Sequence, residues 1–420
     1  MKTRDLLLPS LLLFAAATPL TAQHYSKKVL LKGLAAPTGI AVHSSGDLYF
    51  TQLPEPGKFS SKNLVSLWDS QTMKVQTIVS GEPAPTNIVV LPDRTFYWTC
   101  VTAGVIMKRK GSSQSLVRSG LKSPTGIAIG PSGGVWFTQI PTPGVPGNKG
   151  GKNELTLLSG NTLTTLAMGE PEPKDVVVDP KGNAYWTCRT AGVILRRDAA
   201  TTKITKVLDG LEKPVGIAMD GMGDLYFTEV PTPGMSGAKG GRNKVWRYSP
   251  AARALTLISF GEPYPADVAV SSDGSRVYWT CMTAGVILEA TRIANPALIS
   301  SMSPTGSGQT VQLALSSKSH AGMPFQTATA FGLGPIPVDS RYLALAPDGL
   351  FFLTLLGMGK PIFQGYGGKL DANGQGMASI TLPREALFKG LHLYSAFVVL
   401  DARSPTGIAG ISNSHRLVIQ

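Results

Sequence analysis

The sequence predicts an all-β protein with two parts: a six-bladed β-propeller closed by an N-terminal strand, and then a small antiparallel β-sandwich. Three observations predict this fold. Two alternating sequence units recur between residues 27 and 292. The composition favours turns over helices, because 47 glycines and 31 prolines accompany only 15% charged residues. After residue 293 the repeat stops and unrelated strand-like segments follow.

Each sequence unit has the pattern of a propeller blade. The first unit, PTGIAVHSSGDLYFTQLPEPG at Pro37–Gly57, has related copies that begin at Pro124 and Pro214. The second unit, GEPAPTNIVVLPDRTFYWTC at Gly81–Cys100, also occurs three times. In each copy a short apolar strand, a turn and an aromatic, β-branched strand precede two weaker strands. Four strands in about 45 residues is the size of one blade, so six copies predict six blades.

The ring is expected to close through its N-terminal strand. The last unit has inner strands at Val268–Val270 and Val277–Cys281 and a third at Gly285–Ala290, without a clear fourth. The segment KKVLLKGL at Lys27–Leu34 matches the fourth-strand pattern of the other units. We expect it to pair with the last blade, because this pairing removes a free sheet edge.

These units resemble NHL repeats and the wider six-bladed family that includes SMP-30/gluconolactonase and strictosidine-synthase-like proteins. GIAIGPSGGVWFTQ at Gly126–Gln139 is also similar to repeats of virginiamycin B lyase. The resemblance covers about Lys27–Arg292 and implies the propeller architecture. It implies no single activity, since these repeats carry unrelated functions. Val311–Gln420 resembles a C-terminal β-domain of secreted planctomycete-type bacterial proteins, which implies an accessory, surface or sorting role.

The expected domain boundaries follow from composition. Residues 1–22 have the pattern of a signal peptide, with a basic start, the apolar stretch Leu6–Ala17 and a small residue, Ala22, at its end. Residues 23–293 form the predicted propeller, 294–310 a linker rich in Ser, Pro and Gly, and 311–420 the predicted sandwich. No later stretch is apolar for the roughly 20 residues of a membrane span. A secreted monomer is therefore expected, whether extracellular, periplasmic or at the cell surface.

The charge of the chain indicates its class of partner. The formal net charge is +13, which favours an anionic small molecule or an acidic polysaccharide. Nucleic acid is not an expected partner, because basic residues are not interleaved with aromatic residues in a recognised binding fold.

The first candidate site lies at the start of the inner strands. Asn87, Asp175 and Asp267 occupy equivalent positions and alternate around the ring with Gly39, Gly126 and Gly216. Two carboxylates and an amide around a channel suit Ca²⁺ or another divalent cation. The SMP-30 resemblance implies such an ion at comparable strand starts. The alternative is that these side chains accept hydrogen bonds from backbone amides and have only a structural role.

Further candidate ligand-binding residues lie in the loops of the same face. The GEP loops contribute Glu82, Glu170 and Glu262, which could supplement the ion or act as a base. The long loops begin with Gln52, Gln139 and Glu229, and two of them carry the basic residues Lys152 and Arg242. The alternative is that these basic loops are solvated and only keep the protein soluble.

The three cysteines, Cys100, Cys188 and Cys281, all lie in copies of YWTC. A metal site, a redox site and the interior of a repeated fold are the possible explanations. Cysteines in alternate blades are expected to lie beyond the roughly 7 Å Cα separation that a disulfide allows. They are therefore predicted to be buried thiols that pack beside the Trp of the same strand.

Two functions remain open from the sequence. One is a secreted binding or scaffold protein with its ligand on the channel face. The other, implied by the family resemblance, is a metal-dependent lactone hydrolase or lyase with its ion on Asn87, Asp175 and Asp267. None of the five histidines recurs in the repeats, and no HExxH motif is present.

Overall fold

The computed structural model describes residues 24–55, 62–143, 151–233, 241–293, 296–301, 308–339, 341–382 and 384–420. The predicted signal peptide lies outside these residues. Within them, the regular structure is β-strand apart from one short α-helix, α1 (Gly349–Leu355), and two 3₁₀ turns. The all-β prediction is confirmed. No helix in these ranges is both long and apolar enough to cross a membrane.

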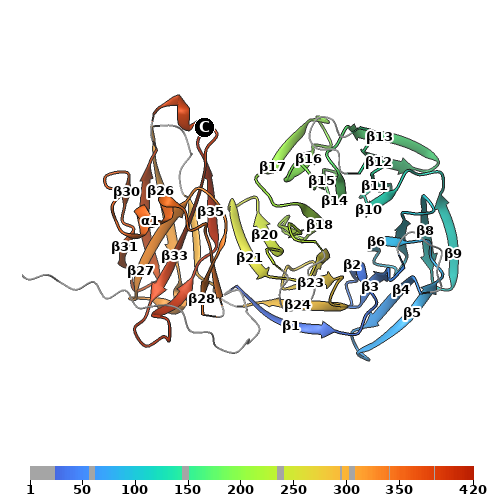
Figure 1. Ribbon diagram of the computed structural model, residues 1–420, viewed down its shortest axis with the longest axis horizontal. Coiled ribbons are helices and arrows are strands. Elements are labelled where there is room, and N and C mark those ends of the chain that lie inside the picture. Colours follow the sequence, from blue (N-terminus) through green and yellow to red (C-terminus); the bar gives the residue numbers. More distant parts are fainter. Residues whose placement is uncertain are drawn as a thin grey trace, which may run out of the picture.

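The described residues of the repeats form antiparallel four-stranded units, which Figure 1 shows arranged radially around one axis. Five of them follow the chain from the inner to the outer strand. Their strands are β2 (Pro37–Val42), β3 (Leu48–Gln52), β4 (Leu64–Asp69) and β5 (Lys74–Ser80); β6 (Pro85–Val90), β7 (Phe96–Cys100), β8 (Val105–Lys110) and β9 (Ser113–Arg118); β10 (Pro124–Ile129), β11 (Val135–Gln139), β12 (Glu154–Ser159) and β13 (Thr162–Met168); β14 (Pro173–Val178), β15 (Ala184–Cys188), β16 (Val193–Arg197) and β17 (Ile204–Leu208); β18 (Pro214–Met219), β19 (Leu225–Glu229), β20 (Lys244–Ser249) and β21 (Ala254–Phe260).

The sixth unit contains both ends of the repeat region. Its strands are β22 (Pro265–Val270), β23 (Arg276–Cys281), β24 (Val286–Arg292) and the N-terminal β1 (Tyr25–Leu31). β1 pairs antiparallel with β24, and Lys28 lies opposite Glu289 in this ladder. The N-terminal strand thus supplies the fourth strand of the last sheet, as the sequence predicts.

The C-terminal part is a sandwich of two antiparallel sheets. One sheet contains β25 (Leu298–Ser301), β26 (Thr310–Ser316), β32 (Gln375–Thr381) and β30 (Phe363–Gln364). The other contains β35 (Ser414–Val418), β33 (His392–Leu400), β27 (Pro324–Ala330) and β31 (Gly367–Lys369), with β34 (Ile408–Ile411) beside β33. Buried side chains of both sheets, including Leu313 and Phe397, form one core between them. A separate hairpin joins β28 (Pro335–Val338) to β29 (Arg341–Ala344).

The structure differs from the predicted linker at 294–310. Leu298–Ser301 form β25, which pairs with β26 at the start of the sandwich. Ile299 is buried there, and its amide donates to the side chain of Asn413. The sequence did not predict this strand, because β25 is only four residues long and lies in a Ser- and Pro-rich stretch. The residues that it pairs with, Leu313–Ser316, lie outside the predicted linker.

The two parts share a continuous sheet. The outer strand β21 of the fifth unit pairs with β35, so the sheet continues from the propeller into the sandwich (Figure 1). One apolar cluster crosses this junction and contains Trp246 and Leu255 from the propeller with Tyr394 and Val398 from the sandwich. This pairing covers β21, the edge strand of the fifth unit. A covered edge strand is protected from pairing with the strands of other chains.

Candidate functional site at the channel

The inner strands place Asn87, Asp175 and Asp267 together at the channel. All three line one cavity of about 240 Å³ that the inner strands β2, β6, β10, β14, β18 and β22 surround. The Asn87 side-chain amide donates to Asp175 Oδ1 at 3.0 Å, although the two residues are 88 positions apart. Asp267 lines the same cavity, and its carboxyl group interacts electrostatically with that of Asp175. We call these three residues the channel trio.

Each aspartate of the trio joins neighbouring sheets through backbone amides. Asp175 accepts from the amide of Val176 at 2.8 Å and from that of Ile217, on the next sheet, at 2.9 Å. Asp267 accepts from the amide of Val268 on its own sheet, and from the first sheet it accepts the amide of Ile40. Both carboxyl groups therefore have the structural role that the sequence left open as an alternative.

The glycines that alternate with the trio are required by close packing. A Cβ on Gly126 would lie 2.4 Å from Asp175 Cα, and one on Gly216 would lie 2.6 Å from Asp267 Oδ1. A Cβ on Gly39 would lie 2.6 Å from Asn87 Cα. The repeat of Gly and Asn or Asp thus reflects how closely the inner strands approach each other.

The two carboxyl groups of the trio both have raised pKa values. Burial raises the pKa of Asp175 to about 7, while the backbone amides of Ile217 and Val176 partly oppose this rise. Burial and the neighbouring charge of Asp175 raise the pKa of Asp267 well above its usual value. The pair can thus hold one proton near neutral pH.

A second cavity, of about 230 Å³, opens on the loop face of the trio. We call it the channel mouth. Its walls include the apolar side chains of Leu53, Val215 and Met282, and its polar groups include Lys174 and Tyr264. The trio lines this cavity as well as the channel cavity, so it lies between the two.

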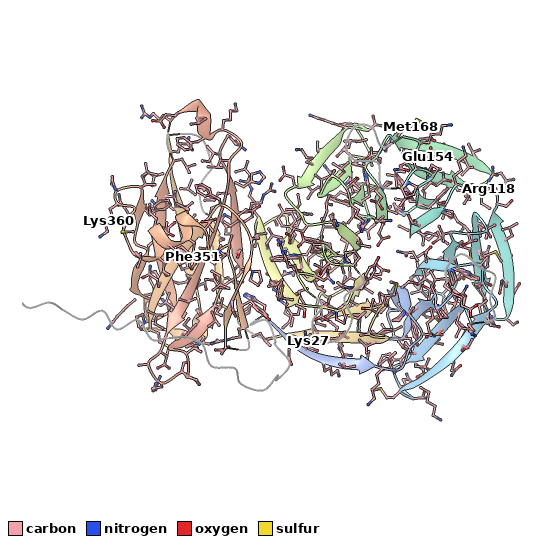
Figure 2. The ribbon with its side chains drawn as sticks, viewed as in Figure 1. Lys27, Arg118, Glu154, Met168, Phe351 and Lys360 are labelled. Carbon is pink, nitrogen blue, oxygen red and sulfur yellow. The ribbon has the colours of Figure 1, made fainter. Side chains whose placement is uncertain are left out.

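The three glutamates of the GEP loops are buried beside the cysteines, where they do not reach the trio's cavities. Glu82 Oε2 accepts from Trp98 Nε1 at 2.8 Å and from Cys100 Sγ at 3.3 Å. The same contacts recur one copy later, where Glu170 accepts from both Trp186 and Cys188. Glu262 accepts from Cys281, and Lys27 of β1 donates to it at 2.6 Å (Lys27 is labelled in Figure 2).

These contacts explain the repeated cysteines. All three cysteines are free and buried. Cys100 and Trp98 pack in one cluster with Tyr49 and Val65 of the preceding sheet. Burial raises the pKa of the Cys100 thiol well above its usual value, and the nearby Glu82 adds to this effect. A thiol that stays protonated is a poor nucleophile and metal ligand, so the thiols act as packed donors.

The remaining predicted ligand-binding residues lie further from the axis. Gln52 and Gln139 are buried and accept the backbone amides of Ala35 and Lys122. Glu229, their counterpart, accepts the amide of Glu212. Lys152 is exposed, and Arg242 forms an ion pair with Glu212.

The sequence did not point to Lys174 and Tyr264, two polar residues that line the channel mouth. Lys174 directly precedes Asp175 and forms an ion pair with Glu172 at 2.9 Å. Tyr264 lies in the last GEP loop, where the other copies have Ala84 and Glu172. The signal available in the sequence was this departure from the repeat, but only the fold shows that the two positions face one cavity.

The described residues contain no group of three or more His, Cys, Asp and Glu side chains that could hold a metal ion. The trio contributes two carboxyl groups and one amide, but Asn87 Oδ1 accepts from the Ile88 amide. Ca²⁺ takes six to eight oxygen ligands, so the trio in this hydrogen-bonded form does not fit the ion.

Comparison with solved structures places this fold among known propellers. A gluconolactonase from Xanthomonas campestris aligns with a TM-score of 0.52 and 14% identity, covering 67% of this chain and 94% of that one. Regucalcin from Agrobacterium tumefaciens, a calcium-binding protein, aligns with a TM-score of 0.50 and 13% identity, covering 64% and 95%. This chain has the propeller fold of these proteins. Virginiamycin B lyase from Staphylococcus aureus is similar at a TM-score of 0.43 and 18% identity, covering 69% and 95%.

The alignments cover about two thirds of this chain. At these identities the likeness establishes the propeller fold alone, because function depends on the residues of the site. Neither a protein-family model nor a curated protein matches the sequence.

Proposed function

We propose that this protein is a secreted propeller that binds a small ligand at the channel mouth, and that the ligand combines an apolar body with an anionic group. The observation that carries the proposal is the channel mouth itself. It is concave, mostly apolar and supplied with a few polar groups, which is the usual character of a small-molecule site.

The charge at the mouth supports an anionic ligand. Lys174 is a cation in the cavity wall, and it shares the carboxylate of Glu172 with Arg189, at 2.9 Å and 3.2 Å. The net charge of +13 acts in the same direction by attracting anions to the protein.

The state of the trio supports binding over catalysis. Its carboxyl oxygens already accept backbone amides of two sheets. A general base must be free to take a proton from its substrate. The trio in its present hydrogen bonds acts as the floor of the ligand site.

The test is a calorimetric titration with phenylacetate, and with 2-phenylethanol as a neutral probe of similar shape. We expect phenylacetate to bind more tightly, and Lys174→Met to weaken it about tenfold or more, because a charge-assisted hydrogen bond contributes about 1.5–3 kcal/mol. Lys181→Met, in the turn at the other end of β14, is the matched control. Equal binding of both probes, or no effect of Lys174→Met, would contradict the proposal.

A second proposal is a metal-dependent lactone hydrolase or lyase, as the names of the similar propellers suggest. The observation in its favour is the meeting of two carboxyl groups at Asp175 and Asp267, where a divalent cation could replace a bound proton. The oxygens would first have to leave their backbone amides, so we derive no catalytic step. Metal analysis and thermal unfolding with Ca²⁺ and with chelator test it: no bound ion and no shift in melting would reject it.

A further inference from the structure

A third cavity, of about 240 Å³, lies between the propeller and the sandwich. We call it the interdomain cavity. The propeller contributes its β17–β18 loop and the side chains of Glu229 and Lys244. The sandwich contributes Phe331, His392 and Tyr394. It is separate from the channel, because it shares no lining residue with the two cavities of the trio.

The propeller wall of this cavity contains a buried charged cluster. Lys244 Nζ lies 2.5 Å from Glu212 Oε2 and 3.3 Å from Glu229 Oε2. The side chains of Lys244 and Glu229 are only 5% and 4% exposed. Trp246 Nε1 donates to Glu229 Oε2 at 2.8 Å. Charged groups are rarely buried to this extent unless they are paired, and here each one is paired.

This cluster is a local departure from the repeat. Where the fifth unit has Glu229, the first and third units have Gln52 and Gln139. Lys244 corresponds to Leu64 and Glu154, and Trp246 corresponds to Ser66 and Thr156. Three changed positions contact one another, and they lie in the unit that the sandwich covers.

The opposite end of the cavity is also charged and paired. Asp209 forms an ion pair with Arg416 of β35 and lies 3.5 Å from His392 Nδ1. Arg416 also donates to the Val207 carbonyl at 3.2 Å, so it is fixed between the two domains. The carboxylates of Asp209 and Glu212 are 26% and 31% exposed, so they are more accessible than Arg416 and Lys244, with which they pair.

The balance of charge indicates the class of ligand. Each of the three carboxylates already has a cationic partner: Asp209 pairs with Arg416 and with the exposed Lys206, Glu212 with Arg242 and Lys244, and Glu229 with Lys244. A charged ligand would leave one charge unmatched, which is costly in a partly buried site. Paired carboxylates still have lone pairs that can accept hydrogen bonds from hydroxyl groups. Phe331, which is 49% exposed, adds an apolar aromatic surface to the same cavity.

We propose that the interdomain cavity binds one neutral, hydroxyl-rich ring, the size of a single sugar unit. Its hydroxyl groups donate to Asp209 and Glu212 and accept from Lys244, while its C–H face packs on Phe331. The volume is below the roughly 300–1,000 Å³ of drug-sized sites, which limits the ligand to about one ring. Because residues of both domains hold the ring, its binding also stabilises their junction.

The test titrates the full-length protein with D-glucose, D-galactose, D-mannose and N-acetyl-D-glucosamine, up to about 10 mM, by saturation-transfer NMR and calorimetry. We expect at least one sugar to bind, and Phe331→Ala and Glu212→Gln to weaken it at least tenfold. The matched controls are Lys122→Gln and Glu154→Gln, at the corresponding positions of the third unit. Glu154 is labelled in Figure 2 on the side of the propeller away from the sandwich.

The variants separate this site from the channel mouth. Phe331 is half exposed, so Phe331→Ala is expected to keep the melting temperature of the unliganded protein. Lys174→Met should leave sugar binding unchanged. The proposal is overturned if none of the four sugars binds, if the third-unit controls weaken binding as much as Glu212→Gln, or if Lys174→Met abolishes binding while Phe331→Ala does not.

Discussion

Asp267 on the last sheet of the ring accepts a hydrogen bond from the backbone amide of Ile40 on the first sheet, at 2.9 Å across 227 positions of sequence. This contact closes the ring at its inner strands, while the pairing of β1 with β24 closes it further out. A buried carboxyl group at the end of the chain of repeats thus holds the first and last sheets together.

Asp267→Asn should destabilise the ring closure. The variant has nearly the same size, but one of its two side-chain oxygens becomes an NH₂ group that cannot accept the Ile40 amide. We expect a loss of about 1–3 kcal/mol in the free energy of unfolding, which lowers the melting temperature by several degrees. Calorimetry would measure it, with the exposed Glu385→Gln as control. Unchanged melting of Asp267→Asn would show that the contact has no structural role.

The raised pKa of Asp175 predicts a pH dependence of stability. The pKa of Asp175 is 3.8 in the unfolded reference and about 7 in the folded protein, so the folded state binds more protons between these values. The stabilisation from this pair is complete below about pH 4 and is lost as the pH rises to about 7. Melting temperatures of the wild type and Asp175→Asn, measured from pH 4 to pH 7, should converge as the pH rises. Parallel curves would contradict the raised pKa of Asp175.

Gly126→Ala should disrupt the channel. The added Cβ would meet Asp175 Cα at 2.4 Å, and this backbone atom cannot move without shifting an inner strand. We expect a loss of about 3 kcal/mol or more in the free energy of unfolding. Gly349→Ala, where a Cβ meets nothing within 4 Å, is the control. Urea unfolding of both variants measures the difference, and similar stabilities would mean that the inner strands can separate easily.

The cysteines should be unreactive in the folded protein. Cys100, Cys188 and Cys281 are buried and their pKa values are raised by burial, so very little thiolate forms at neutral pH. Titration with Ellman's reagent should detect no thiol under native conditions and three in guanidinium chloride. Rapid reaction of the native protein with even one equivalent would show that a thiol is accessible.

Much of the fold could be predicted because repeats leave a direct record in the sequence. Alternating apolar strands, turn residues and the incomplete last unit predict the sheets and the role of Lys27–Leu34 as a closing strand. The trio was also predicted to surround one channel, since equivalent positions in a ring share one radius. The ligand-binding roles of individual residues stay predictions, and so do the domain boundaries, apart from the strand Leu298–Ser301 found within the predicted linker.

The rest depends on contacts between segments that are distant in the sequence. Glu82 has the same spacing from the inner strand whether it faces the channel or Trp98, and only the packed structure shows that it faces Trp98. Strand β25 was missed because its four residues acquire a strand conformation only through pairing with β26.

The sequence by itself determined the type of sheet, the order of the units and the strand that closes the ring, because these follow from local periodicity copied along the chain. Tertiary structure alone decided that burial raises the pKa values of Asp175 and Asp267 and that β35 extends the fifth unit. It also decided that Lys244 lies in a cavity between two domains. Burial and proximity set the proton affinity and the partners of a side chain, and neither quantity exists until segments far apart in the sequence are packed together.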